Sequence, residues 1–147
     1  MKTKNWMYGL LVAGVMMAAA CGGNQQPTGR ELLSANEWAL TEIVTPDSTT
    51  TQMPVNGAWI AFSDSTRVGG YAGCNAFFGT FETTAENGIS FSQFGRTMMF
   101  CTDMEIENLF LATFEKMTSF LVEEGRLELT DGGGSKLSFD VRSAPQP

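Results

Sequence analysis

The chain has 147 residues, a formal net charge of −7 and no histidine. Its lysines and arginines are scattered, which excludes the basic surface that nucleic acid or anionic lipid headgroups would require. The lack of histidine excludes Ser-His-Asp and Cys-His catalytic arrangements, and the length suits one domain behind a short leader.

The first 20 residues have the pattern of a bacterial export signal. Lys2 and Lys4 precede an uncharged apolar run, residues 6–20, which is shorter than the ~20 residues that span a bilayer. Cys21 follows directly, as in a lipobox, where this cysteine receives a diacylglycerol and becomes the new N-terminus. Ala18 stands where that pattern more often has leucine, and it would also suit an ordinary A-x-A cleavage site. We predict a lipoprotein signal peptide at 1–20 and lipidation of Cys21.

The chain that follows the signal peptide is expected to consist of a lipid-anchored tether, a soluble domain and a short tail. Residues 21–33, rich in glycine, glutamine and asparagine, predict a flexible tether; residues 34–142 form the domain, and 143–147 a tail. Loss of the two leader lysines changes the net charge from −7 to −9. The expected location is the cell envelope, with the lipid in the outer membrane and the domain facing the periplasm. The expected partner at this end of the chain is the lipid bilayer, bound through the Cys21 anchor.

The residue pattern in the first half of the domain predicts β-strands. They are expected over 37–44, from residue 59 to a turn near 63–65, over 75–83 and over 89–94, with a loop at 45–57. Asn87-Gly88 is a strong hairpin signal between the last two.

After residue 101 the spacing of the apolar residues changes to that of an α-helix. Residues 102–120 carry apolar side chains at helical offsets, namely Ile106, Leu109, Phe110, Phe114 and Met117. Thr102 and Glu105 match a capping box, and the carboxylates of Asp103, Glu105 and Glu107 would favour the positive end of the helix dipole.

Strands return after the helix, with a bend at Gly125 and a turn at 130–136. In residues 136–141, Leu137, Phe139 and Val141 are expected to point inward and Ser138 and Asp140 outward. The expected fold is mainly β (α+β): a small, curved antiparallel sheet or barrel-like domain with one amphipathic helix.

Cys74 lies in the stretch GGYAGCNAFFG, and its thiol is compared with metal sites, thiol catalysis, a phosphate-binding loop and a disulfide. A closed zinc site lacks ligands, and a copper(I) site would need Cys101 with Met98 and Met99. Thiol catalysis lacks a histidine base, and no phosphate-binding glycine motif is present. If Cys21 is lipidated, Cys74 and Cys101 are the two remaining cysteines of an exported chain, where disulfides form readily. We therefore predict a Cys74–Cys101 disulfide, with no metal and no cofactor. Asn75 is interpreted as a turn residue.

The chain resembles the META domain (HslJ-like) family in six segments: WAL, GGYAGCNAFFGTF, TMMFC, EIENLFLATFEKMTSF, LELT and KLSF. In the third segment, Phe100 takes the place of a small residue. The residues that match its motif are Gly73, Cys74, Asn75, Phe78, Gly79, Thr97, Met99 and Cys101. The resemblance implies a compact β-rich fold with a helix, export and lipid anchoring. It also implies a link to heat shock and novobiocin resistance, and it offers no catalytic residue.

The carboxylates do not form a catalytic pair. Glu123 and Glu124 would point to opposite faces of a strand, and the acidic residues at the helix start are explained by capping. We therefore expect a non-catalytic envelope lipoprotein that binds or inhibits an unknown envelope protein. The alternative is a binder of a small apolar ligand in the mouth of the barrel. An apolar cavity would favour the binding of a small ligand. A filled interior with an exposed apolar patch would favour the binding of a protein.

Overall fold

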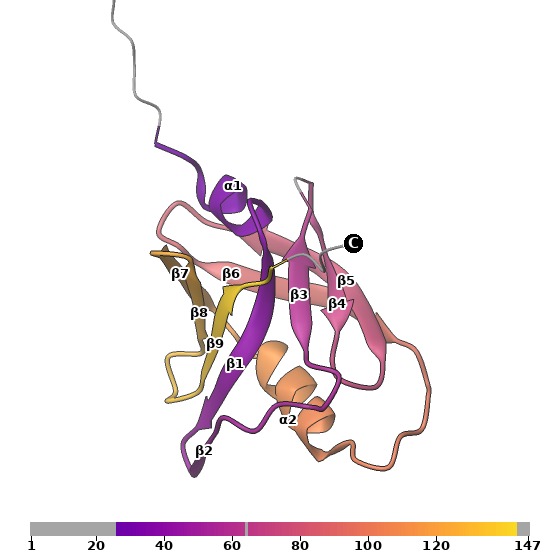
Figure 1. Ribbon diagram of the computed structural model, residues 1–147. Helices are drawn as coiled ribbons and strands as arrows, with labels where there is room; N and C mark the ends of the chain where they lie inside the picture. Colours follow the sequence, from indigo (N-terminus) through magenta and orange to yellow (C-terminus); the bar gives the residue numbers. More distant parts are fainter. Residues whose placement is uncertain (1–25, 64, 144–147) are drawn as a thin grey trace, which may run out of the picture.

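The computed structural model describes residues 26–63 and 65–143, so the predicted signal peptide, Cys21 and all but the first residue of the expected tail lie outside the described residues. The described chain forms a curved antiparallel sheet and two helices (Figure 1). The elements in chain order are α1 (Gly29–Ser34), β1 (Glu37–Thr45), β2 (Ser48–Thr50), β3 (Trp59–Phe62), β4 (Arg67–Tyr71), β5 (Ala76–Thr83), β6 (Ile89–Arg96), α2 (Glu105–Phe114), β7 (Ser119–Glu123), β8 (Arg126–Thr130) and β9 (Lys136–Val141).

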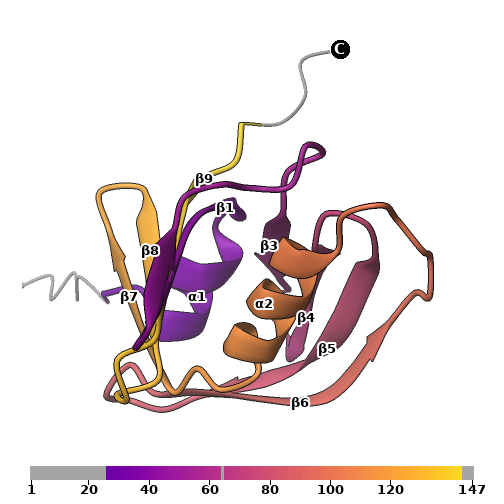
Figure 2. The same ribbon diagram turned by 90° about the horizontal axis from the view of Figure 1, so that it is seen from below.

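Eight strands follow one path through the sheet, in the order β6-β5-β4-β3-β1-β9-β8-β7, and the short β2 pairs with β1. The sheet curls into a half-barrel, with α2 held inside the curl (Figure 2). The two outer strands approach each other at one corner, where Gly88 bridges to Ser119 and the Ile89 amide donates to the Thr118 carbonyl at 2.9 Å. The predicted mainly-β, curved antiparallel fold is therefore confirmed.

The first strand lies in the middle of the sheet, between β3 and the last strand. β1 pairs with β9 from Trp38↔Val141 to Val44↔Lys136, with an irregularity after Leu40. The two ends of the domain thus pair side by side, and this pair joins strands β3 to β6 to strands β7 and β8.

The interior of the curl is filled by aromatic side chains. Phe110 and Phe114 of α2 are fully buried, and the Phe114 ring lies 4.3 Å, centroid to centroid, from that of Phe91. Phe77 meets both helix rings edge to face, and Phe139 closes the far side. Such tilted and edge-on packing is what aromatic quadrupoles favour. In the described part of the chain, no helix is long and apolar enough to cross a membrane.

The predicted helix is shorter than the sequence suggested. It runs from Glu105 to Phe114, and Met104 occupies the N-cap without a side-chain cap, so the expected Thr102–Glu105 capping box does not form. The reason lies upstream, because residues 97–101 are bonded to the start of β5 and the helix begins only after this segment ends.

A second helix forms where a flexible tether was expected. Thr28 and Glu31 make a reciprocal capping box at the start of α1, and Leu33 is fully buried. The Leu33 carbonyl accepts a hydrogen bond of 2.8 Å from the indole nitrogen of Trp38. Ordered structure therefore begins before residue 34, and the domain has two helices rather than one.

The expected alternation of β9 fails at two positions. Ser138 is fully buried, and its hydroxyl donates to the Glu42 carboxylate at 3.3 Å, whereas Val141 is 40% exposed at the end of the strand. The inward pattern therefore holds for Leu137 and Phe139, both fully buried, and is lost where the strand leaves the core.

Candidate functional site

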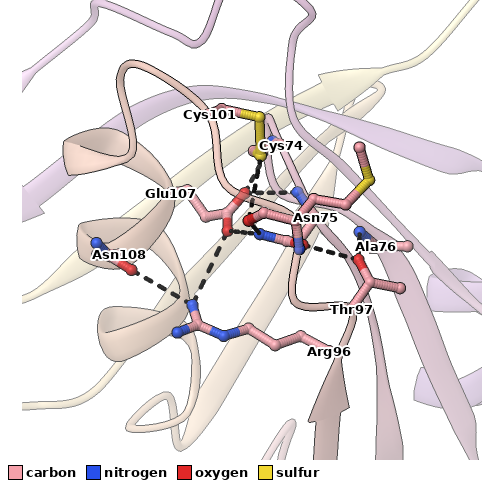
Figure 3. A network of polar contacts seen from close by, with 9 residues as sticks. Cys74, Asn75, Ala76, Arg96, Thr97, Cys101, Glu107 and Asn108 are labelled. Atoms are coloured by element: carbon pink, nitrogen blue, oxygen red, sulfur yellow. Dashed lines mark hydrogen bonds and ion pairs between the residues drawn. A yellow bond between two sulfur atoms is a disulfide. The ribbon is translucent and has the colours of Figure 1, made fainter.

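The stretch around Cys74 and the segment after β6 meet at the start of α2 (Figure 3). Residues 72–75 turn from β4 into β5, and the predicted disulfide joins Cys74 to Cys101 with 6.1 Å between the Cα atoms. Gly73 has a φ of +122°, and a Cβ there would lie 2.6 Å from the Pro54 side chain, so the turn requires glycine.

The centre of the site is the carboxylate of Glu107, whose side chain is only 1% exposed. One oxygen accepts hydrogen bonds from the backbone amides of Cys74 at 2.8 Å and Asn75 at 2.7 Å. The other accepts from the Asn75 side-chain amide at 2.7 Å and lies 3.9 Å from a guanidinium nitrogen of Arg96. A buried charge is tolerated when it is bonded in this way.

These contacts decide the ionisation of Glu107. Burial acts to raise the pKa of its carboxyl, but the hydrogen bonds from Asn75 and Cys74, with the positive charge of Arg96, outweigh it and hold the pKa below its ordinary value of 4.5. Glu107 is therefore ionised in the fold at neutral pH, and both of its carboxylate oxygens accept hydrogen bonds from the protein.

Asn75 uses its whole side chain to hold the segment after β6. Its oxygen accepts from the Met99 amide at 2.7 Å and from the Thr97 hydroxyl at 2.9 Å. Its NH₂ group donates to the Met99 carbonyl at 3.1 Å as well as to Glu107. All four hydrogen-bonding positions of the amide are thus filled. Asn75 is a clamp between two chain segments, which is more than the turn residue that the sequence suggested.

The clamped segment exposes its apolar side chains. Met98, Met99 and Phe100 are 86%, 62% and 94% exposed, although the backbone that carries them is bonded on both sides. The two ends of this short run are thus fixed while its side chains contact water.

Two residues of the predicted family motif lie elsewhere. Phe78, 61% exposed, pairs across the sheet with Gly95, and its ring lies where a Cβ on that glycine would be. A Cβ on Gly79 would lie 3.0 Å from the Phe94 ring and 3.1 Å from a backbone oxygen. Both therefore shape the β5–β6 pair rather than the buried network.

The two cysteines and the exposed glutamates bear on the chemistry considered from the sequence. Both predicted disulfide sulfurs are bonded to each other, so Cys101 has no thiolate for the copper(I) site considered above. No group of three His, Cys, Asp or Glu residues suited to a metal occurs within residues 26–63 and 65–143. Glu124 lies in the β7–β8 turn with a φ of 50°, and both it and Glu123 are exposed.

The burial of Glu107 was not predicted, although the sequence contains a signal for it. Glu107 stands three residues before Phe110 and seven before Phe114, so the helical period places it on the buried face. An acidic residue on an apolar face predicts a buried partner. The partner, the asparagine of the cysteine motif, is 32 residues away and could not be identified from spacing.

Comparison with known proteins identifies the domain. The META domain family model matches residues 31–144. A search of curated proteins finds no match. Among solved structures, an NMR structure of a protein from Burkholderia xenovorans has a TM-score of 0.65 at 20% identity, covering 97% of this chain and all of that one. A crystal structure of a DUF4847 family protein from Bacteroides vulgatus has a TM-score of 0.61 at 12% identity, covering 76% of this chain and 95% of that one. These structures share the fold.

Proposed function

The chain belongs to the META domain family, and from this premise and the site we propose that it is a non-catalytic, lipid-anchored envelope protein that acts by binding another protein. The META domain is not a known enzyme family. The proposed anchor is Cys21, with the domain on the periplasmic side of the outer membrane, and the proposed setting is stress or antibiotic resistance.

The single observation that carries this proposal is the exposed apolar run Met98–Phe100 on a fixed backbone. A buried carboxylate, an asparagine and a disulfide together hold a segment whose own side chains add nothing to the core. Exposed apolar groups that are grouped and held in place are typical of surfaces that bind other proteins.

The alternative, a small apolar ligand in the mouth of the half-barrel, has less support. The curl is filled by α2 and its phenylalanines, which occupy the space that such a ligand would need. A hollow of about 710 Å³ is lined by residues of β3, β4 and β5 that include Trp59 and Phe78. It is an open surface hollow and not an enclosed pocket of the kind that buries most of a small ligand.

Two measurements on the full chain in its native host test the proposal. A lipid precursor with a clickable acyl chain should label the wild type and leave Cys21→Ser unlabelled; equal labelling of both would contradict the anchor. A lysine-reactive cross-linker applied to intact cells should give a discrete adduct containing a second protein. A domain that yields no such adduct under any condition, including heat and novobiocin, would refute the binding role.

A further inference from the structure

We propose that Met98, Met99 and Phe100 form a preformed docking ridge that inserts into an apolar cleft on a partner protein, a cleft flanked by lysine or arginine side chains. This inference rests on the proposed binding function and specifies its site and its partner's chemistry. The three residues are called the Met98–Phe100 ridge below.

The backbone of the ridge is fixed at alternate positions. Thr97 is held at its amide by the Ala76 carbonyl at 3.0 Å, Met99 by Asn75 through both its amide and its carbonyl, and Cys101 by the disulfide. Each fixed residue lies next to a ridge side chain or carries one. A segment held in this way loses little conformational freedom when it binds, which favours affinity.

The ridge side chains have the chemistry of an interface centre. Methionine side chains are flexible and polarisable and adapt to an irregular cleft, while an aromatic side chain supplies large apolar area. The three exposed side chains amount to roughly 500 Å² of surface, against about 800 Å² per partner in a standard stable interface. The ridge is therefore sized for the centre of a transient complex and is too small to sustain a permanent dimer by itself.

The charges around the ridge specify the partner. Asp103 and Glu105 follow it and are exposed, and Glu115 lines a hollow of about 590 Å³ together with Met98. Arg96 lines the same hollow, and its guanidinium is paired with Glu107 and Asn108. An acidic rim is complementary to basic side chains, whereas a second copy of this acidic chain would place like charges opposite each other.

The position of the ridge favours a protein over the bilayer. Figures 1 and 2 both show the segment between β6 and α2 on the side of the domain opposite α1, where the chain enters from its N-terminus. The segment that carries the ridge therefore lies away from the end of the domain to which the proposed lipid leads. Its acidic surroundings oppose anionic headgroups.

The test is photo-cross-linking of the full chain in its native host. A benzophenone amino acid replaces Phe100, and the same group at Leu121, which is 43% exposed on β7, is the matched control. We expect an adduct from position 100 at least tenfold above that from position 121, with the partner peptide mapped to an apolar cleft flanked by lysine or arginine. Asp103→Lys with Glu105→Lys should lower the yield at least tenfold.

Folding is checked with the variant Met98→Ser with Met99→Ser, carrying the benzophenone at position 100. It should lose the adduct while its unfolding midpoint stays that of the parent, because both methionines lie in water. Adducts only to a second copy or to lipid, a cross-linked surface without basic residues, or equal yields from positions 100 and 121 would each overturn the ridge. If the lysine-reactive adduct persists in those cases, the binding function survives and only its assignment to the ridge fails.

Discussion

Replacing Glu107 by glutamine tests whether the buried network depends on a carboxylate. In the structure three donors converge on this group: the amides of Cys74 and Asn75 and the side-chain NH₂ of Asn75. A glutamine oxygen can serve the two backbone amides, but its own NH₂ then faces the NH₂ of Asn75. Turning Asn75 over is no remedy, because it would place that NH₂ against the Met99 amide.

The size of the loss follows from these contacts. One charge-assisted hydrogen bond is removed, worth about 1.5 to 3 kcal/mol, and a buried donor is left without an acceptor, at about 1 to 3 kcal/mol. Because the two contributions overlap, we expect E107Q to lower the free energy of unfolding by about 2 to 4 kcal/mol. For a domain of this length that corresponds to a fall in Tm of about 10 °C.

The measurement is thermal and urea unfolding at pH 7 with the disulfide intact. E105Q is the matched control, because Glu105 is exposed two residues earlier on the same helix, and we expect a change within about 0.5 kcal/mol. Equal stability of E107Q and the wild type would refute the role assigned to the carboxylate.

The same pair of proteins gives a pH dependence with a defined sign. The pKa of Glu107 is lower in the folded state than its ordinary value of 4.5, so the stabilisation is fully present above pH 4.5 and is lost as pH falls through the folded pKa. The difference in unfolding free energy between wild type and E107Q should therefore narrow below pH 4.5. A difference that widens there would contradict the bonding described.

Three further changes test other parts of the fold. Replacing Cys74 and Cys101 together by alanine opens a loop with a sequence separation of 27, and urea unfolding should show a loss of about 3.5 kcal/mol in the chain-entropy estimate; an unchanged midpoint would contradict it. Gly70→Ala places a Cβ 2.0 Å from a carbonyl oxygen of β3, so the variant should be strongly destabilised or fail to accumulate, whereas Gly133→Ala, at 3.5 Å from its nearest contact, should be expressed normally. Phe78→Ala removes the ring that covers a glycine of β6 and should lower the unfolding free energy by about 0.5 to 1 kcal/mol, measured by urea titration.

The strands could be predicted because their signals are local. Alternating apolar residues and the turns at Asn87 and Gly125 gave the strands from β5 to β9 to within a few residues, since each depends on neighbours in the sequence. The Thr28–Glu31 capping box was present as well, but it lay in a polar stretch interpreted as tether. Local patterns are informative where they agree with the surrounding composition.

The network at Glu107 could not be predicted because its energy comes from distant partners. The sequence shows an acidic residue near a helix start, where a favourable dipole is a sufficient explanation. Only the fold brings the asparagine of the cysteine motif to the same point, and only then does the carboxylate become a fixed anion. The exposure of Met98 and Phe100 was equally hidden, because apolar residues beside a cysteine suggest a core position.

The pairing of the first strand with the last has a consequence for biogenesis. Without β9, β1 and β8 each lack one neighbour, so strands β3 to β6 with β1 are not joined to the β7–β8 hairpin through β9. The sheet is therefore completed only when the last strand of the domain is in place. A chain that ends a few residues before Lys136 would present two unpaired strand edges, which are templates for pairing with another chain.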